Sequence, residues 1–144
     1  MHLPRPGFHS ITPYLFVKDA RRLIGFLGRA FDASVQSEQT RPDGVIMHAE
    51  LRIGDSMVML AEAGEGFGPT LTSLYLYVSD CDRSFQRAIS AGGECVFPVE
   101  TMPSGERYGG LKDPCGNIWW VASHVEDLTQ EEQDRRWREL RESK

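Results

Sequence analysis

Cysteine is scarce in this chain of 144 residues, which has three: Cys81, Cys95 and Cys115. An odd number of cysteines without close spacing indicates neither a disulfide framework nor a thiolate metal site, and it is typical of a reducing compartment. No stretch approaches the roughly 20 consecutive apolar residues of a membrane span. Residues 1–6 also lack the apolar run of a secretion signal. We therefore expect a cytoplasmic protein with no membrane partner.

Positive charge is also in short supply. The chain has 16 Lys and Arg against 21 Asp and Glu, a formal net charge of −5. Proteins that bind nucleic acid or anionic membranes carry clustered Lys and Arg, so we expect no nucleic-acid partner. The length and the 40% hydrophobic content are typical of one globular domain, and we expect residues 1–144 to form a single domain.

An internal repeat organises the chain. Residues 11–19 recur in outline as residues 72–80, at an offset of 61 residues. At this offset Tyr14 matches Tyr75, and the same register pairs Asp19 with Asp80. Self-similarity at a fixed period is the signature of a repeated structural unit, so the sequence predicts a duplicated module.

The first module is predicted over about residues 9–62. Residues 11–17 alternate as a strand, and Asp19 is a good N-cap for an amphipathic helix whose apolar face includes Leu23, Leu27 and Phe31. This helix should lie on the sheet face opposite Tyr14. Strands are then predicted at 34–40, 45–53 and 56–62, which gives the order βαβββ. Residues 63–70 are rich in glycine and are predicted to link the two modules.

The second module is predicted over about residues 71–124. It has a strand at 73–78, a helix that begins after Asp80, a strand at 94–98, a loop at 99–106, and strands at 108–112 and 118–124. A charged helix is predicted at about 129–142, with Thr129 and Glu132 as a capping box. Its apolar anchors are Trp137 and Leu140, so it should pack weakly or against a partner. The fold class is therefore α+β, with two tandem βαβββ modules and an extra C-terminal helix.

Several segments in this order resemble the vicinal oxygen chelate superfamily of glyoxalases, bleomycin-resistance proteins and extradiol dioxygenases. The resemblance rests on the paired modules, on residues 17–19 at the first helix and on residues 113–119 before the last strand. Residues 48–55, 107–109 and 123–129 are similar to the PhnB-like branch of that superfamily. The resemblance implies a curled mixed sheet around a cup, with the helices on its outer face. It also implies a homodimer with pockets near the subunit boundary.

Metal-dependent members of the superfamily carry ligands on the first and fourth strands of each module. Transferring these places by alignment gives Thr12, Met59, Ser73 and Trp120. None is a His or a carboxylate, and an indole offers only an N–H donor. The resemblance therefore implies no metal and no cofactor here.

Strand parity predicts which side chains face the cup. Aromatic and methionine side chains with a few polar groups are typical of a pocket for a flat or partly apolar molecule. The alternative is that these aromatics are packed core. The predicted ligand-binding residues are Tyr14, Phe16, His48, Glu50, Met57, Met59, Tyr75, Tyr77, Tyr108 and Trp120, with Arg52 also inside or at the rim.

His48 and Glu50 lie two residues apart on one strand and so share a face. A histidine beside a carboxylate can act as a general base, which makes this pair the candidate for catalysis. The alternative is that Glu50 pairs with Arg52 or Lys112 on an exposed face. A metal site made of His48, Glu50 and His124 is a further possibility.

The sequence thus predicts a metal-independent protein that binds a small organic molecule and acts as a homodimer. The alternative is a glyoxalase-like lyase or isomerase that uses an atypical metal site or the His48 and Glu50 pair. Whether the protein is an enzyme stays open at this point.

Overall fold

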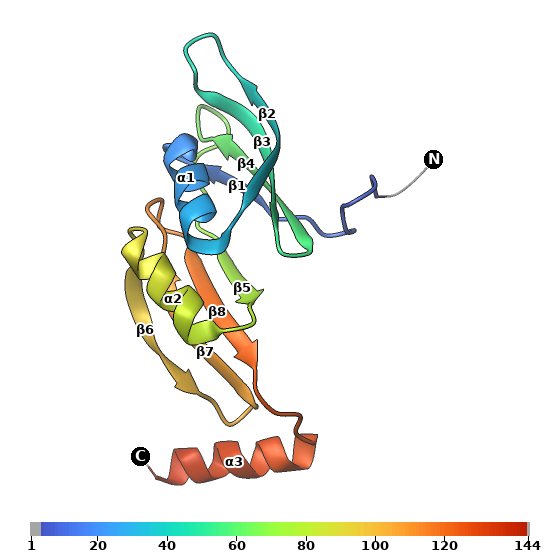
Figure 1. The fold of residues 1–144 in the computed structure, drawn as a ribbon, viewed down its shortest axis with the longest axis vertical. Coiled ribbons are helices and arrows are strands. Elements are labelled where there is room, and N and C mark those ends of the chain that lie inside the picture. The colour runs from blue at the N-terminus through green and yellow to red at the C-terminus, as the bar shows by residue number, and fades with distance from the viewer. Residues whose placement is uncertain (1–3, 144) are drawn as a thin grey trace.

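The repeated sequence folds as two βαβββ modules followed by a helix (Figure 1). The computed structural model describes residues 4–143. The first module contains β1 (Tyr14–Val17), α1 (Ala20–Phe31), β2 (Ser34–Thr40), β3 (Ile46–Ile53) and β4 (Ser56–Glu62). The second contains β5 (Ser73–Tyr77), α2 (Cys81–Ser90), β6 (Glu94–Thr101), β7 (Glu106–Lys112) and β8 (Ile118–His124), and the last helix is α3 (Gln130–Glu142).

Each module forms its own four-stranded mixed sheet. The strand orders are β1-β4-β3-β2 and β5-β8-β7-β6, and the first strand of each module runs parallel to its fourth. Tyr14 lies opposite Met59 in the first sheet, and Tyr75 lies opposite Trp120 in the second. These pairs differ by the 61-residue offset of the repeat, so the duplication extends to strand register. The predicted α+β class is confirmed.

One face of each sheet is covered by a helix. On β1, Leu15 and Val17 are buried against the core that contains Leu23 and Leu27 of α1, whereas Tyr14 is 41% exposed on the other face. The helix thus lies opposite Tyr14, as the alternation predicts. Its N-terminus is held by Glu62 of β4, whose carboxylate accepts the backbone N–H groups of residues 19 and 20 at 2.8 and 3.0 Å.

The modules meet through their helices, and α1 and α2 lie side by side in Figure 1. Arg87 of α2 donates to Asp32, which follows α1, at 2.6 and 2.8 Å. The ring of Phe31 lies 5.3 Å from that of Trp119 on β8. The helix-covered faces therefore share one core, while within residues 4–143 no helix packs against the opposite face of either sheet.

Three strand boundaries differ from the prediction by two residues or more. β1 begins at Tyr14 because Pro13 has no N–H to donate and Thr12 turns back to the carbonyl of His9. β6 continues through Pro98 to Thr101, which is possible because β6 is an edge strand. β7 begins at Glu106, since the predicted loop is only a tight turn in which Gly105 has φ +88°.

α3 lies across the end of the second module, away from both sheets' helices (Figure 1). The Thr129 hydroxyl accepts the N–H of Glu132 at 3.1 Å, but the Glu132 carboxylate binds Arg135 and Arg136, so only half of the predicted capping box forms. None of its residues is buried. Within residues 4–143, no helix is both long and apolar enough to cross a membrane.

Candidate functional site

We call the face of each sheet that lacks a helix its open face. Pairing register and alternation place all ten predicted ligand-binding residues on these two faces. The first-module open face carries Tyr14, Phe16, His48, Glu50, Met57 and Met59, together with Arg52. The second-module open face carries Tyr75, Tyr77, Tyr108 and Trp120, together with His124, which the sequence offered as a metal ligand, and with Phe97 and Glu106, which it did not single out.

A chain of hydrogen bonds crosses the first-module open face. The Tyr14 hydroxyl lies 3.0 Å from His48 Nδ1, and His48 Nε2 lies 3.0 Å from Glu50 Oε2. Tyr14 also stacks on Phe16 at a centroid distance of 4.6 Å, and Phe16 stacks on Phe67 at 5.5 Å. The predicted pair of His48 and Glu50 is thus formed, and it extends to a phenol that faces solvent.

Glu50 is buried, with 7% of its surface exposed. Arg5, from the segment before β1, donates to its Oε2 at 2.7 Å and lies 4.2 Å from the ring of Phe8. The hydrogen bond with His48, joined by that from Arg5, holds the pKa of Glu50 below its usual value against the effect of burial. The alternative that Glu50 pairs with Arg52 or Lys112 on an exposed face is therefore wrong. The segment before β1 folds over this face, and its Arg5 supplies the cation.

Five aromatic rings form a continuous wall on the second-module open face. Neighbouring ring centroids lie 5.3 to 5.9 Å apart along the series Tyr77, Tyr75, Tyr108, Trp120 and Phe97. The Trp120 indole packs directly over Gly110 of β7, where an added Cβ would come within 2.8 Å of the ring. Its Nε1 donates to Ser73 Oγ at 3.0 Å. We call these five residues the aromatic wall.

The carboxylate of Glu106 lies at the Tyr77 end of the aromatic wall. Glu106 Oε1 accepts the hydroxyl of Tyr77 at 2.5 Å and that of Tyr75 at 3.3 Å, and Oε2 lies 2.8 Å from His124 Nδ1. Burial raises the pKa of Glu106, but these three hydrogen bonds together lower it below its usual value. The Glu106 side chain is therefore ionised at neutral pH although it is only 14% exposed.

His124 joins Glu106 to the segment that leads into α3. Its Nε2 lies 2.6 Å from a carboxylate oxygen of Asp127. The hydrogen bonds with Asp127 and Glu106 raise the pKa of His124 above its ordinary value.

The sequence analysis missed Glu106 because the composition of residues 99–106 predicts a loop. The signal that could have found it is the parity of β8, which places His124 on the same face as Trp120 and opposite Glu106.

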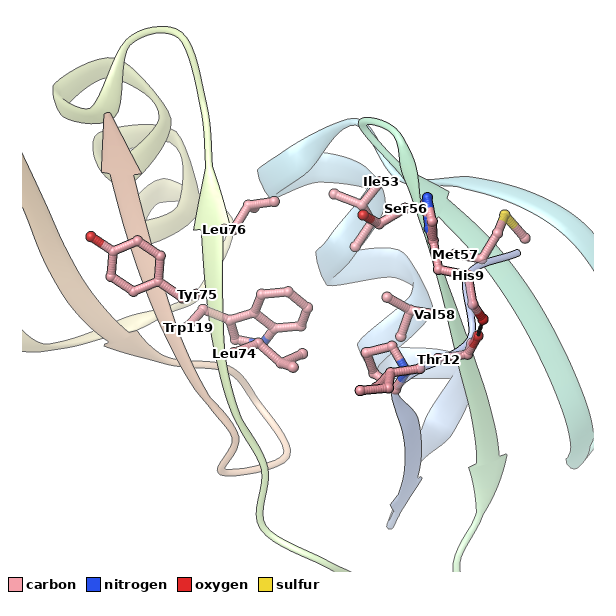
Figure 2. A pocket seen from close by; sticks show the side chains of 12 residues that line it. His9, Thr12, Ile53, Ser56, Met57, Val58, Leu74, Tyr75, Leu76 and Trp119 are labelled. Carbon is pink, nitrogen blue, oxygen red and sulfur yellow. Dashed lines mark hydrogen bonds between the residues drawn. The ribbon is translucent and has the colours of Figure 1, made fainter. Parts of the chain in front are cut away.

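An apolar cleft of about 270 Å³ lies elsewhere, between the modules. Figure 2 shows Leu74, Leu76 and Trp119 on one side of it and Ile53 and Val58 on the other. Met57 and Tyr75 touch the cleft, but their side chains turn to the far sides of β4 and β5 (Figure 2). The cleft is thus a gap on the helix side of the sheets, distinct from the open faces.

Within one chain, the structure groups the predicted residues by module. Tyr14 and Phe16 line a hollow of about 480 Å³ with Met47 and Phe67, whereas Trp120 lies in the aromatic wall of the other sheet. His124 lies on the second sheet and His48 on the first, each with its own carboxylate. In the part of the chain that the structure describes, no three His, Cys, Asp or Glu side chains are grouped so as to hold a metal ion.

The four positions at which the superfamily holds a metal do not suit a divalent cation here. The Thr12 hydroxyl donates to the carbonyl of His9 at 3.1 Å, and Ser73 Oγ already accepts the Trp120 indole N–H. Met59 offers a thioether, which is a poor ligand for zinc, iron or manganese. The residues present therefore do not fit the metal that the fold family implies.

Comparisons with known proteins agree with this architecture. Residues 7–121 match the model of the Glyoxalase/Bleomycin resistance protein/Dioxygenase superfamily. An uncharacterised protein of Mycobacterium bovis is 35% identical over 134 residues, which cover 85% of this chain and 88% of that protein.

Solved structures show the same fold. TioX from Micromonospora sp. ML1 is similar with a TM-score of 0.70 and 30% identity, over 80% of this chain and 98% of that one. A Bacillus cereus PhnB protein, described as a putative 3-demethylubiquinone-9 3-methyltransferase, has a TM-score of 0.64 and 22% identity, over 80% of this chain and 99% of that one. The chain belongs to the glyoxalase/bleomycin resistance protein/dioxygenase superfamily.

Proposed function

We propose that this protein binds a small, flat or partly apolar organic molecule against its open faces, without a metal ion. The observation that carries the proposal is the aromatic wall. Its rings lie on the face that no helix covers, and Tyr75 and Tyr77 remain 44% and 63% exposed. Aromatic rings give large contact area and stacking geometry to a planar ligand. The alternative of packed core does not account for this exposure.

We also propose that the protein belongs to the PhnB-like branch. In support, His48 and Glu50, from the segment 48–55 that resembles this branch, lie on the first-module open face. We also propose a location in the cytoplasm. This agrees with the three cysteines, which are all free in the structure.

We propose that two copies of the chain complete the cup. Large apolar side chains stay uncovered at the open faces, including Tyr14 and Met47 of the first module and Phe67 of the linker, which stacks on Phe16. A monomer rarely leaves such adjoining patches in water, and two-fold pairing is the commonest form of oligomer. Sedimentation equilibrium at micromolar concentration should give twice the 16.2 kDa chain mass. A mass of one chain at all concentrations would contradict this.

Ligand binding can be tested with a thermal-shift screen of flat aromatic compounds, followed by calorimetry on the hits. We expect Trp120→Ala to weaken binding at least tenfold, because it removes the centre of the aromatic wall. Val35→Ala, at an exposed position on β2 of the first module, is the control and should leave affinity unchanged. Metal analysis of the same samples should give far less than one transition metal ion per chain. Equal affinity of wild type and Trp120→Ala would refute the site.

A second candidate function is acid-base catalysis by a lyase or isomerase. The observation that favours it is the chain from Glu50 through His48 to the exposed hydroxyl of Tyr14, since a carboxylate orients an imidazole for proton transfer. A ligand with an acidic C–H should then exchange that hydrogen in D₂O, as followed by NMR, and His48→Gln should abolish the exchange. Exchange at the same rate in His48→Gln would rule this candidate out.

A further inference from the structure

The charge around Glu106 is unbalanced. In the part of the chain that the structure describes, His124 is the one basic group within ion-pair distance of Glu106, and Asp127 shares the same imidazole. Even with His124 protonated, these three groups carry a net charge of −1. The second-module open face therefore ends in an anionic group that residues 4–143 do not neutralise.

The first-module open face differs in this respect. Glu50 has Arg5 at 2.7 Å as well as His48, so its charge is matched within the chain. On the first-module open face, the chain thus supplies an arginine to the carboxylate. At the corresponding end of the second module, the residues that the structure describes supply only the shared histidine.

The unbalanced carboxylate lies against exposed aromatic rings. Both Tyr75 and Tyr77 donate to Glu106 and contact each other at a centroid distance of 5.3 Å. The faces of such rings attract cations, and a carboxylate that is mostly withdrawn from water attracts them more strongly than one in bulk solvent. Aromatic faces next to a carboxylate form a surface that suits an organic cation.

We infer that the ligand carries a positively charged amine or quaternary ammonium group on its flat ring system, and that Glu106 pairs with this group at the end of the aromatic wall. The inference rests on the proposed function and adds the chemical class of the ligand. Trp120 and its neighbours contact the ring system, and Glu106 selects for its charge.

Three probes that share one ring system test this. They are 2-naphthylmethylamine, which is cationic at neutral pH, 2-naphthylmethanol, which is neutral, and 2-naphthoate, which is anionic. Calorimetry on wild-type protein should show the amine binding at least about tenfold tighter than the alcohol, with the naphthoate weakest. Glu106→Gln should bring the amine to alcohol ratio close to one while the alcohol keeps its affinity.

Two further variants separate charge from folding. Glu106→Asp keeps the charge and should keep the preference for the amine. Glu94→Gln removes a carboxylate from an exposed position at the start of β6 and should keep the wild-type ratio. Circular dichroism melts of all three variants show whether each is folded.

The outcomes distinguish the two proposals. Binding of the alcohol as tightly as the amine to wild type, or an amine preference that survives in Glu106→Gln, would overturn the inference about charge and leave the proposed function standing. Binding of none of the three probes, at concentrations where stacking on the wall should saturate, would count against the proposed function and the inference together.

Discussion

At the scale of single residues, the hydrogen-bonded polar side chains separate into a structural and a functional set. Asp113 belongs to the first set. It is 4% exposed and accepts the Trp119 indole N–H at 2.8 Å, the Cys115 backbone N–H at 2.8 Å and the Asn117 amide at 3.1 Å. The segment from Asp113 to Trp119 thus holds the turn before β8 and fixes Trp119 in the core shared by the modules.

We predict that Asp113→Ala lowers the free energy of unfolding by about 3 kcal/mol or more, because it leaves several buried donors unsatisfied. Urea unfolding followed by far-UV circular dichroism measures this. Asp134→Ala, at an exposed position on α3, is the control and should change stability by less than about 0.5 kcal/mol. Equal effects of the two substitutions would contradict the structural role of Asp113.

His124 belongs to the functional set, and its pKa can be measured directly. We predict that Asp127→Asn and Glu106→Gln each lower the His124 pKa toward its ordinary value, as followed by NMR titration of the imidazole. Because the folded-state pKa is raised, the stabilisation from protonated His124 is complete below the ordinary imidazole pKa and is lost as pH rises through the raised value. A His124 pKa that neither substitution alters would show that these contacts do not form.

At the scale of elements, β7 determines the shape of the aromatic wall. Gly109 lies under Phe85 and Val99 on the helix side, and Gly110 lies under Trp120 on the open face. A Cβ at either position would come within 3.0 Å of these side chains. Two adjacent glycines thus let a helix and a large indole approach opposite faces of one strand.

We predict that Gly110→Ala lifts the Trp120 indole from β7, lowers the free energy of unfolding by about 1–3 kcal/mol and weakens ligand binding. The check is urea unfolding together with calorimetry on the ligand found by screening. Gly44→Ala is unsuitable as a control, because Gly44 has φ +88°. Gly68→Ala is the better control, because a Cβ at Gly68 would contact no other atom and its φ is not positive. It should leave stability and ligand affinity unchanged. Unchanged affinity in Gly110→Ala would contradict the close packing of Trp120.

Most elements could be predicted from the sequence because each carries a local signal. Alternation of apolar and polar residues predicts the strands, and Asp19 and Asp80 predict where the helices begin. The offset of 61 residues predicts the second module once the first is assigned. The extent of β6 and β7 could not be predicted in this way, since Pro98 and the turn at 102–105 have loop-like composition. Their pairing is decided by contacts across the sheet, and Glu106 was missed for that reason.

At the scale of the whole molecule, the open faces could be predicted but their partners could not. Parity assigned Tyr14 and Trp120 to the uncovered faces without reference to the other strands. The pairing of Arg5 with Glu50 depends on how residues before β1 fold back, and no local pattern in a proline-rich segment specifies that. How the two open faces come together in the proposed homodimer likewise depends on a second chain.

The proposed function depends above all on binding of the ligand by the aromatic wall of the second module. The most direct measurement is the set of three indole N–H resonances in a ¹H–¹⁵N NMR spectrum recorded while a ligand found by screening is added. We predict that the Trp120 resonance shifts until the site is saturated. The Trp119 resonance should not shift, because this indole is buried and donates its hydrogen bond to Asp113. A saturable shift of Trp119 with none at Trp120 would place the ligand in the cleft between the modules and refute the proposed site.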